Sequence, residues 1–309
     1  MKICVLISCY NYATFLRDAV NSAISQTRRV DEIVIVDDGS TDSSAEIARE
    51  LAAKDKRIKV IEQQNTGQLG AFEAGIQETR ADWIFLLDAD DKWRSNHVET
   101  CLGSLLDDPK TGWIYSQLSF FGDDPSEPPY QYKLPYGPLG ESCLWALASF
   151  GISNFPFLAT ATSAMAFRAD LIRPILPFSK VAQGDWKVCA DEVLVVALSL
   201  LGARRVALRD VTVDYRVHAK NHFAGTQSHA ENSRAGARLR LKSELMTKLG
   251  MDERSVTKLW EEFAACPNKN SFLRRRYAQA ALSSLMPIDR RILNSWKIYS
   301  TSLEASDES

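Results

Sequence analysis

Three aspartates in the segment LLDADD, namely Asp88, Asp90 and Asp91, directly follow the apolar run at residues 83–87. Carboxylates packed this closely repel one another unless a cation lies nearby. Hard divalent ions such as Mg²⁺ and Mn²⁺ prefer oxygen ligands and bridge carboxylates to a diphosphate. The segment therefore predicts a metal and diphosphate site. A cluster of helix N-caps is the alternative that these residues leave open.

A second acidic loop, VDDGSTD, places Asp37 and Asp38 after the apolar run at residues 32–36. Taken alone, this loop favours a structural interpretation, because such a sequence also makes a good turn and helix start. Two acidic loops at neighbouring strand ends favour a nucleotide site instead. One carboxylate there accepts a hydrogen bond from a base or ribose while another holds the metal.

The elements that would position these loops alternate between strand and helix. Strands are expected at residues 2–8, 32–36, 57–62 and 83–87, and helices at residues 14–26, 44–54 and 69–79. This repetition predicts an α/β fold with a mostly parallel mixed sheet and helices on both faces. Ligands bind such sheets at the carboxyl ends of the strands, which here carry residues 8–11, 37–38, 63–67 and 88–91.

The second part of the chain is less regular. Strands are expected at residues 163–168 and 205–208, with a helix at residues 191–201 that Gly202 ends. Helical periodicity at residues 230–249 and 256–265 predicts a helical region at the C-terminus.

Composition narrows the class of protein. The chain has 309 residues and six scattered cysteines without a CxxC pair, which predicts buried thiols in the cytoplasm and neither disulfides nor a zinc site. Its start lacks the features of a signal peptide.

The C-terminal region is basic, since residues 226–309 carry 14 Lys and Arg against 10 Asp and Glu. A peripheral contact of these basic helices with the inner face of a membrane stays open beside a solvated helix surface.

Four segments in order carry a family resemblance: SCYNY (8–12), VDDGSTD (36–42), QNTGQLGAFEAGI (64–76) and LLDADD (86–91). Together they resemble the nucleotide-sugar-binding half of family 2 inverting glycosyltransferases, which have the GT-A (Rossmann-like) fold. The resemblance implies a glycosyltransferase domain at residues 1–225, followed by a helical appendage at residues 226–309. Residues 1–100 would bind the nucleotide-sugar and residues 101–225 the acceptor.

The same resemblance implies a reaction and its partners. A sugar passes from a nucleotide-sugar, with a UDP-sugar favoured, to a hydroxyl of a glycan or a lipid-linked acceptor. The reaction depends on Mn²⁺ or Mg²⁺, and nucleic acid is not a partner.

Roles of individual residues follow from their places in the matched motifs. Tyr10 would lie against the nucleobase, Asp38 would accept a hydrogen bond from it, and Asp37 would contact the ribose. The metal ligands implied are Asp90, Asp91 and His218, the last from an Arg-Val-His element. The further residues implied in nucleotide-sugar binding are Ser8, Asn11, Asn65, Gly67, Asp88, Ala89 and Asp90.

The general base is implied by the segment CADEVLVVALSLLGARR, in which spacing back from Gly202 selects Asp191. Ala190 replaces the glutamate that usually precedes this aspartate, and Glu192 is the alternative carboxylate. An inverting transfer needs one base to take the proton of the acceptor hydroxyl during a single attack on the anomeric carbon. No enzyme nucleophile is then required.

The residues bear on two other functions. A nucleotidyltransferase would also use acidic metal ligands, but it would carry a Gly-rich basic loop after the first strand, and SCYNYATFL has no glycine. The second is a catalytically silent scaffold that binds nucleotide-sugars without turnover. Asp191 together with the DADD segment argues against a silent scaffold.

Overall fold

The computed structural model describes residues 1–107, 111–123, 137–139, 161–201, 203–218, 221, 230–250, 260, 263–264, 269, 271–283 and 287–303. Gly202, the expected boundary at residues 225 and 226, and most of the helix expected at residues 256–265 lie outside these ranges.

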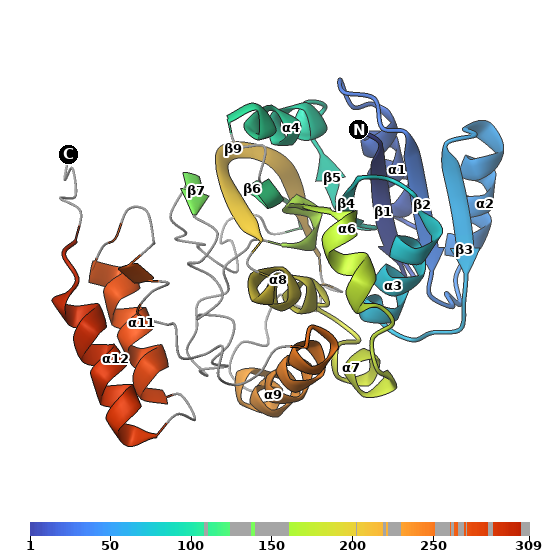
Figure 1. The fold of residues 1–309 in the computed structure, drawn as a ribbon. Helices are drawn as coiled ribbons and strands as arrows, with labels where there is room; N and C mark the ends of the chain where they lie inside the picture. The colour runs from blue at the N-terminus through green and yellow to red at the C-terminus, as the bar shows by residue number, and fades with distance from the viewer. Residues whose placement is uncertain are drawn as a thin grey trace.

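Four parallel strands form the first half of the sheet (Figure 1). They are β1 (Ile3–Cys9), β2 (Glu32–Asp37), β3 (Ile58–Glu62) and β4 (Trp83–Asp88), in the order β3-β2-β1-β4. The apolar runs of β1, β2 and β4 are buried on both faces, as expected for parallel strands between two layers of helices, whereas the edge strand β3 is only partly buried. In the register, Ser8 lies beside both Val36 and Asp88, and Cys9 lies beside Asp37. The carboxyl ends of β1, β2 and β4 are therefore level with one another.

The second half makes the sheet mixed. Next to β4 come β8 (Met165–Arg168), β6 (Thr111–Gly122), β9 (Arg204–Val217) and β5 (Lys92–Trp93), while β7 (Gly137–Leu139) pairs with β9. The pairs β4–β8, β6–β8 and β5–β9 are antiparallel, whereas β6 and β9 are parallel. The α/β fold with a mixed sheet is confirmed.

Strand β9 differs from the expectation, since it extends well beyond residues 205–208. The exposed pair Arg209 and Asp210 interrupts the apolar pattern, so the local sequence predicts that the strand ends before them. The chain nevertheless stays paired with β6, with a register shift around Gln117. This extension carries β9 to Arg216, beside the acidic segment that follows β4.

Helices cover both faces of the sheet (Figure 1). Leu16 and Val20 of α1 pack with Val5 of β1 on one face, and Leu69 and Phe72 of α3 pack with the other. The first face is covered by α1 (Leu16–Ile24), α2 (Ser44–Lys54) and α4 (His97–Asp107). The second is covered by α3 (Gln68–Glu78), α6 (Ala169–Ile172), α7 (Lys180–Asp185) and α8 (Asp191–Leu200), with short 3-10 turns η1 (Thr162–Ala164) and η2 (Arg173–Ile175).

The C-terminal region is helical, as expected. Its helices are α9 (Ala230–Lys248), α11 (Ser271–Ser283) and α12 (Ile288–Ser300). Leu241 and Leu245 of α9 are buried in the same core cluster as α8. Arg238 of α9 forms an ion pair with Glu192 of α8, and Arg240 forms one with Asp185 at 2.8 Å. Helix α9 therefore extends the core around α8. Within the described part of the chain, every helix is too short or too polar to cross a membrane.

His97, at the start of α4, is a fully buried histidine. Its ring packs against Trp93 with the centroids 4.4 Å apart, and its Nδ1 lies 2.7 Å from Thr212 Oγ1. Burial lowers the pKa of His97 from its ordinary value of 6.5 to about 3. The imidazole is therefore neutral in the folded protein at neutral and mildly acidic pH.

We expect His97 to make the fold sensitive to mild acid. Below pH 6.5 the unfolded chain takes up a proton that the folded chain does not bind, so stability falls as the pH drops toward 3. Between pH 7 and pH 5 this difference amounts to about 2 kcal/mol in the free energy of unfolding. Urea denaturation at both pH values measures it. A His97→Gln variant should lose this component, and an unchanged pH dependence in that variant would contradict the assignment.

Candidate active site

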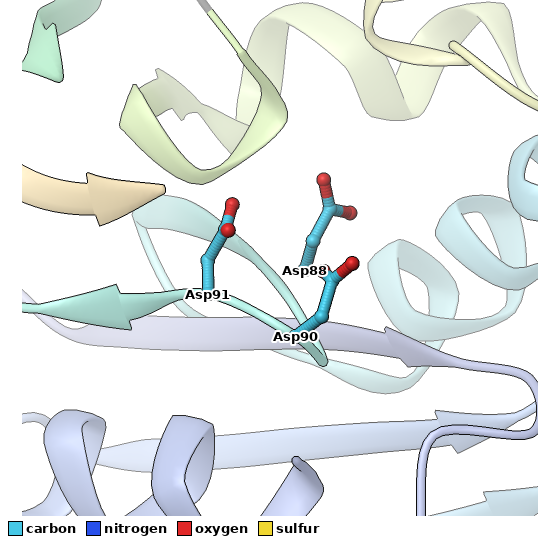
Figure 2. Close-up of side chains that lie close together, drawn as sticks. All are labelled: Asp88, Asp90 and Asp91. Carbon is cyan, nitrogen blue, oxygen red and sulfur yellow. The ribbon is translucent and has the colours of Figure 1, made fainter. Parts of the chain in front are cut away.

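Three carboxylates lie close together in the acidic segment, residues 88–91, at the carboxyl end of β4. Asp88 ends β4, and Asp90 and Asp91 follow before β5. Figure 2 shows the three side chains pointing to the same side of the chain segment. One possible ligand atom from each carboxylate lies within 4.8 Å of those of the other two. This geometry fits a single divalent cation held by oxygen ligands.

Asp91 is fixed from two sides. It is 1% exposed, its Oδ2 accepts a hydrogen bond from Ser163 Oγ at 2.6 Å, and its Oδ1 accepts one from the backbone N of Arg216 at 2.8 Å. Ser163 Oγ also accepts from the backbone N of Asp88 at 3.0 Å. One serine of η1 thus ties the end of β4 to the Asp91 carboxylate, while β9 holds the opposite oxygen.

Asp90 lies against the end of β9. Its Oδ2 is 3.0 Å from Nε2 of His218, and its backbone carbonyl accepts from Arg216 Nε at 2.7 Å. His218 is 7% exposed and packs against Phe15, with ring centroids 4.9 Å apart. The structure therefore brings His218 to the acidic segment from 128 residues further along the chain. His222 lies outside the described residues.

The acidic segment is electrostatically strained without a cation. Burial raises the pKa of Asp88 well above its ordinary value, and the charges of Asp90 and Asp191 raise it further. Burial likewise raises the pKa of Asp91, with added contributions from Asp90 and Asp88. A divalent cation among these oxygens would offset the repulsion and favour the ionised carboxylates. The residues present thus fit the metal that the sequence predicts.

Asp191 begins α8 and is 7% exposed. Gln68 connects its helix to the acidic segment: Gln68 Nε2 donates to Asp88 Oδ1 at 3.0 Å, and the backbone N of Ala190 donates to Gln68 Oε1 at 2.9 Å. The charge of Asp191 also acts on Asp88. The predicted base therefore lies near the acidic segment, and one glutamine side chain sets the separation of the two.

The loop after β2 is occupied with internal contacts. Asp38 is 3% exposed, and its Oδ1 accepts from Gln63 Nε2 at 2.7 Å and from the backbone N of Thr66 at 2.9 Å. Its Oδ2 accepts from the backbone N of Gly67 at 2.8 Å. Asp38 thus positions the loop that contains Asn65, which is exposed.

Gly67 holds a backbone conformation that requires glycine. Its φ of 85° lies in the left-handed region, and a Cβ there would be 2.6 Å from the Cα of Lys187. The next backbone N, that of Gln68, donates to Lys187 O at 2.9 Å. This glycine lets the start of α3 pack directly against the segment that precedes α8.

The ends of β1 and β2 meet in a network around Asn11. Asn11 Oδ1 accepts from the backbone N of Thr41 at 2.7 Å, and its own backbone N donates to Ser40 Oγ at 2.9 Å. Asp37 is 3% exposed; its Oδ2 accepts from the backbone N of Ser40, and its Oδ1 is buried without a hydrogen bond to the described residues.

Tyr10 lies beside this network and is 44% exposed, which leaves a ring free to stack on a planar group. The remaining predicted residues are backbone neighbours of this region: Ser8 is half-buried at the end of β1, and Ala89 is buried between Asp88 and Asp90. All of the predicted site residues thus lie along the strand ends, at the start of α8 or after β9.

Three residues of this region had no predicted role. Gln68 lies inside a segment with family resemblance, whereas Ser163 lies in no motif. Tyr12 is the third: burial raises its pKa, as do the charge of Asp90 and that of Asp88, so its hydroxyl stays protonated and donates to Asp90. The sequence could have indicated a role for Gln68 and Tyr12, because both lie in segments that carry the family resemblance. No sequence pattern indicates a role for Ser163.

Comparison with solved structures defines the class of fold. TarS of Staphylococcus aureus in complex with UDP-GlcNAc has a TM-score of 0.55 at 14% identity, over 97% of this chain and 72% of that one. A mannosyltransferase of Pyrobaculum calidifontis in complex with GDP-Man and Mn²⁺ has a TM-score of 0.53 at 16% identity, over 98% of this chain and 76% of that one. The fold is of the GT-A class.

Sequence relatives define the family. The family described as "Glycosyl transferase family 2" matches residues 4–158. Glycosyltransferase alr2836 of Nostoc sp. is 34% identical over 236 residues, which cover 75% of this chain and 70% of that protein. Glycosyltransferase GlyA of Streptococcus pneumoniae is 38% identical over 106 residues, covering 34% of this chain and 15% of that protein. The chain belongs to glycosyltransferase family 2.

Proposed function

We propose that this protein is an inverting, metal-dependent glycosyltransferase that uses Asp191 as its general base. The donor is a nucleotide diphosphate sugar, with a UDP-sugar favoured, and the acceptor is a hydroxyl of a glycan or glycolipid. One observation carries this proposal. Gln68 connects the three clustered carboxylates at the end of β4 to the start of α8, where Asp191 lies.

The donor assignment rests on the strand-end residues and on the neighbours in structure. TarS was solved with UDP and with UDP-GlcNAc, and the mannosyltransferase with GDP-Man. In this chain, Tyr10 offers a ring for the nucleobase, and Asp37 keeps a buried oxygen for a donor group such as a ribose hydroxyl. Asn11, Asn65 and Gly67 line the loops beside them.

The cofactor is proposed to be Mn²⁺ or Mg²⁺, held by Asp90, Asp91 and His218 with Asp88 alongside. When bound, the ion neutralises the charge that builds on the departing diphosphate. Ser163 and Arg216 orient the Asp91 carboxylate from opposite sides, so the cluster keeps its geometry in the absence of substrate. Mn²⁺ also accompanies GDP-Man in the mannosyltransferase structure.

The proposed chemistry needs one residue to move a proton. Asp191 takes the proton of the acceptor hydroxyl while its oxygen attacks the anomeric carbon from the face opposite the diphosphate. One displacement inverts the configuration at that carbon. Gln68, which contacts Asp88 and the backbone of Ala190, keeps the base at a fixed distance from the donor site.

Titration calorimetry with UDP, GDP and dTDP, each in the presence of Mn²⁺ and again with EDTA, tests the donor and the cofactor together. We expect UDP to release heat with Mn²⁺ and not with EDTA. Binding of GDP or dTDP in place of UDP would assign the donor as a GDP-sugar or a dTDP-sugar. Binding that EDTA leaves unchanged would contradict the metal assignment. Failure of all three to bind would contradict the nucleotide-sugar site.

A further inference from the structure

Helix α12 exposes a line of large apolar side chains. Five of the ten exposed large hydrophobic residues in the described part of the chain belong to this one helix. Ile288, Ile292, Trp296 and Tyr299 are 73%, 58%, 65% and 52% exposed, and their spacing of three or four residues places them on one face. Leu293, 40% exposed, flanks them. These five residues form the α12 stripe.

The opposite face of α12 is the one that packs against the protein. Its buried residues are Asn294, Ser295 and Ile298, and α11 is its principal neighbour. The helix thus buries two polar side chains beside Ile298 and leaves Ile288, Ile292 and Trp296 in water. Exposed apolar area costs about 25 cal/mol per Å², so this orientation leaves favourable burial unused. A contiguous apolar face of this kind marks a surface that binds something.

Basic residues predominate over acidic ones in α12 and in its neighbour α11. Helices α11 and α12 together contain six cations and one acidic residue: Arg274, Arg275, Arg276, Arg290, Arg291, Lys297 and Asp289. Arg275 and Arg290 are exposed. A second copy of the same surface would bring like charges together, which disfavours self-association through this face. An anionic surface complements it.

We propose that the α12 stripe docks this protein on an anionic lipid membrane. The helix of 13 residues is about 20 Å long at ~1.5 Å per residue, too short to span the ~30 Å apolar layer of a bilayer. It suits a helix that lies in the plane of the interface, with isoleucine, leucine and tryptophan inserted and arginines at the headgroups. Trp296 and Tyr299 are side chains enriched at that depth.

The docking surface is separate from the site described above. Figure 1 places α11 and α12 at the end of the molecule opposite β3 and α2, so a docked α12 leaves the strand ends of β1, β2 and β4 uncovered. The proposal does not depend on the sugar donor, the metal or the base.

Sedimentation of the full chain with vesicles tests this proposal. Vesicles of phosphatidylcholine alone are compared with vesicles containing 30% phosphatidylglycerol, at low salt and in 0.5 M NaCl. We expect binding to the anionic vesicles at low salt, weaker binding in high salt, and little binding to phosphatidylcholine. Failure to sediment with anionic vesicles at low salt would overturn the proposal.

Variants assign the binding to the stripe. Ile292→Ser with Trp296→Ser should weaken binding by about tenfold or more, because the inserted apolar area is lost. Arg290→Glu should weaken it through charge. Val181→Ser is the matched control, since Val181 is 57% exposed on α7 and lies outside the stripe. Circular dichroism confirms that each variant is folded.

Two outcomes of the variants would overturn the proposal. Equal loss of vesicle binding in the stripe variant and the Val181 control would show that the stripe is not the docking surface. A dimer in light scattering of the wild type that the stripe variant abolishes would assign the surface to a second copy of the chain instead.

Discussion

Asp191→Asn should lower the rate of sugar transfer by roughly a hundredfold to ten-thousandfold, the range that general-base catalysis contributes. The amide keeps the size of the side chain but cannot take the proton of the acceptor hydroxyl. Nucleotide binding should stay close to that of the wild type, because the strand-end loops are unchanged. Turnover with a saturating donor and calorimetry with UDP and Mn²⁺ separate the two effects.

Glu192→Gln is the comparison that assigns the role to one carboxylate. Glu192 is already paired with Arg238, so its neutralisation removes an ion pair rather than the proposed base. We expect turnover in this variant to stay within a few-fold of the wild type. Near wild-type turnover in Asp191→Asn, or a larger loss in Glu192→Gln, would remove Asp191 from the base role.

Asp90→Asn should abolish metal-dependent nucleotide binding and transfer together. Loss of a partner of a metal ligand typically costs about 10- to 100-fold in metal affinity or activity, and loss of the ligand itself should cost at least as much. Asp90 also repels Asp88 and Asp91. Without metal, the variant should therefore be at least as resistant to thermal unfolding as the wild type. Manganese titration and thermal denaturation with EDTA measure both effects.

Asp170→Asn is a suitable control for Asp90→Asn. Asp170 lies on α6 with its side chain 59% exposed and paired with Arg168, away from the acidic segment. The same charge change there should leave metal binding as it is. Unaltered manganese affinity in Asp90→Asn would contradict the metal site, whatever happens to the rate.

The first half of the sheet could be predicted because its signals are local. β1, β2 and β4 are continuous apolar runs that end in polar loops, and the parallel register follows from the alternation with helices. The level strand ends, and with them the meeting of Asp37 and Asp88 with the end of β1, follow from that pattern. His218 could be placed only through the resemblance, since 128 residues separate it from Asp90.

The remaining features depend on contacts that no local pattern encodes. Gln68 and Ala190 are 122 residues apart, and Ser163 and Asp91 are 72 apart. Their hydrogen bonds exist only once the sheet has brought η1 and α8 to the strand ends. The long β9 was missed because exposed Arg209 and Asp210 sit within a strand whose pairing with β6 continues past them.

The ion pair between Glu192 and Arg238 affects the design of chimaeric enzymes in which the C-terminal region is exchanged. A chimaera that joins residues 1–225 of this chain to the C-terminal region of another glycosyltransferase removes Arg238 and the buried Leu241 and Leu245. Glu192, next to the proposed base and largely buried, then loses its ion pair with Arg238, which is costly. A new tail grafted onto this protein should therefore supply a cation to α8 in place of Arg238, or Glu192 should be replaced together with the tail.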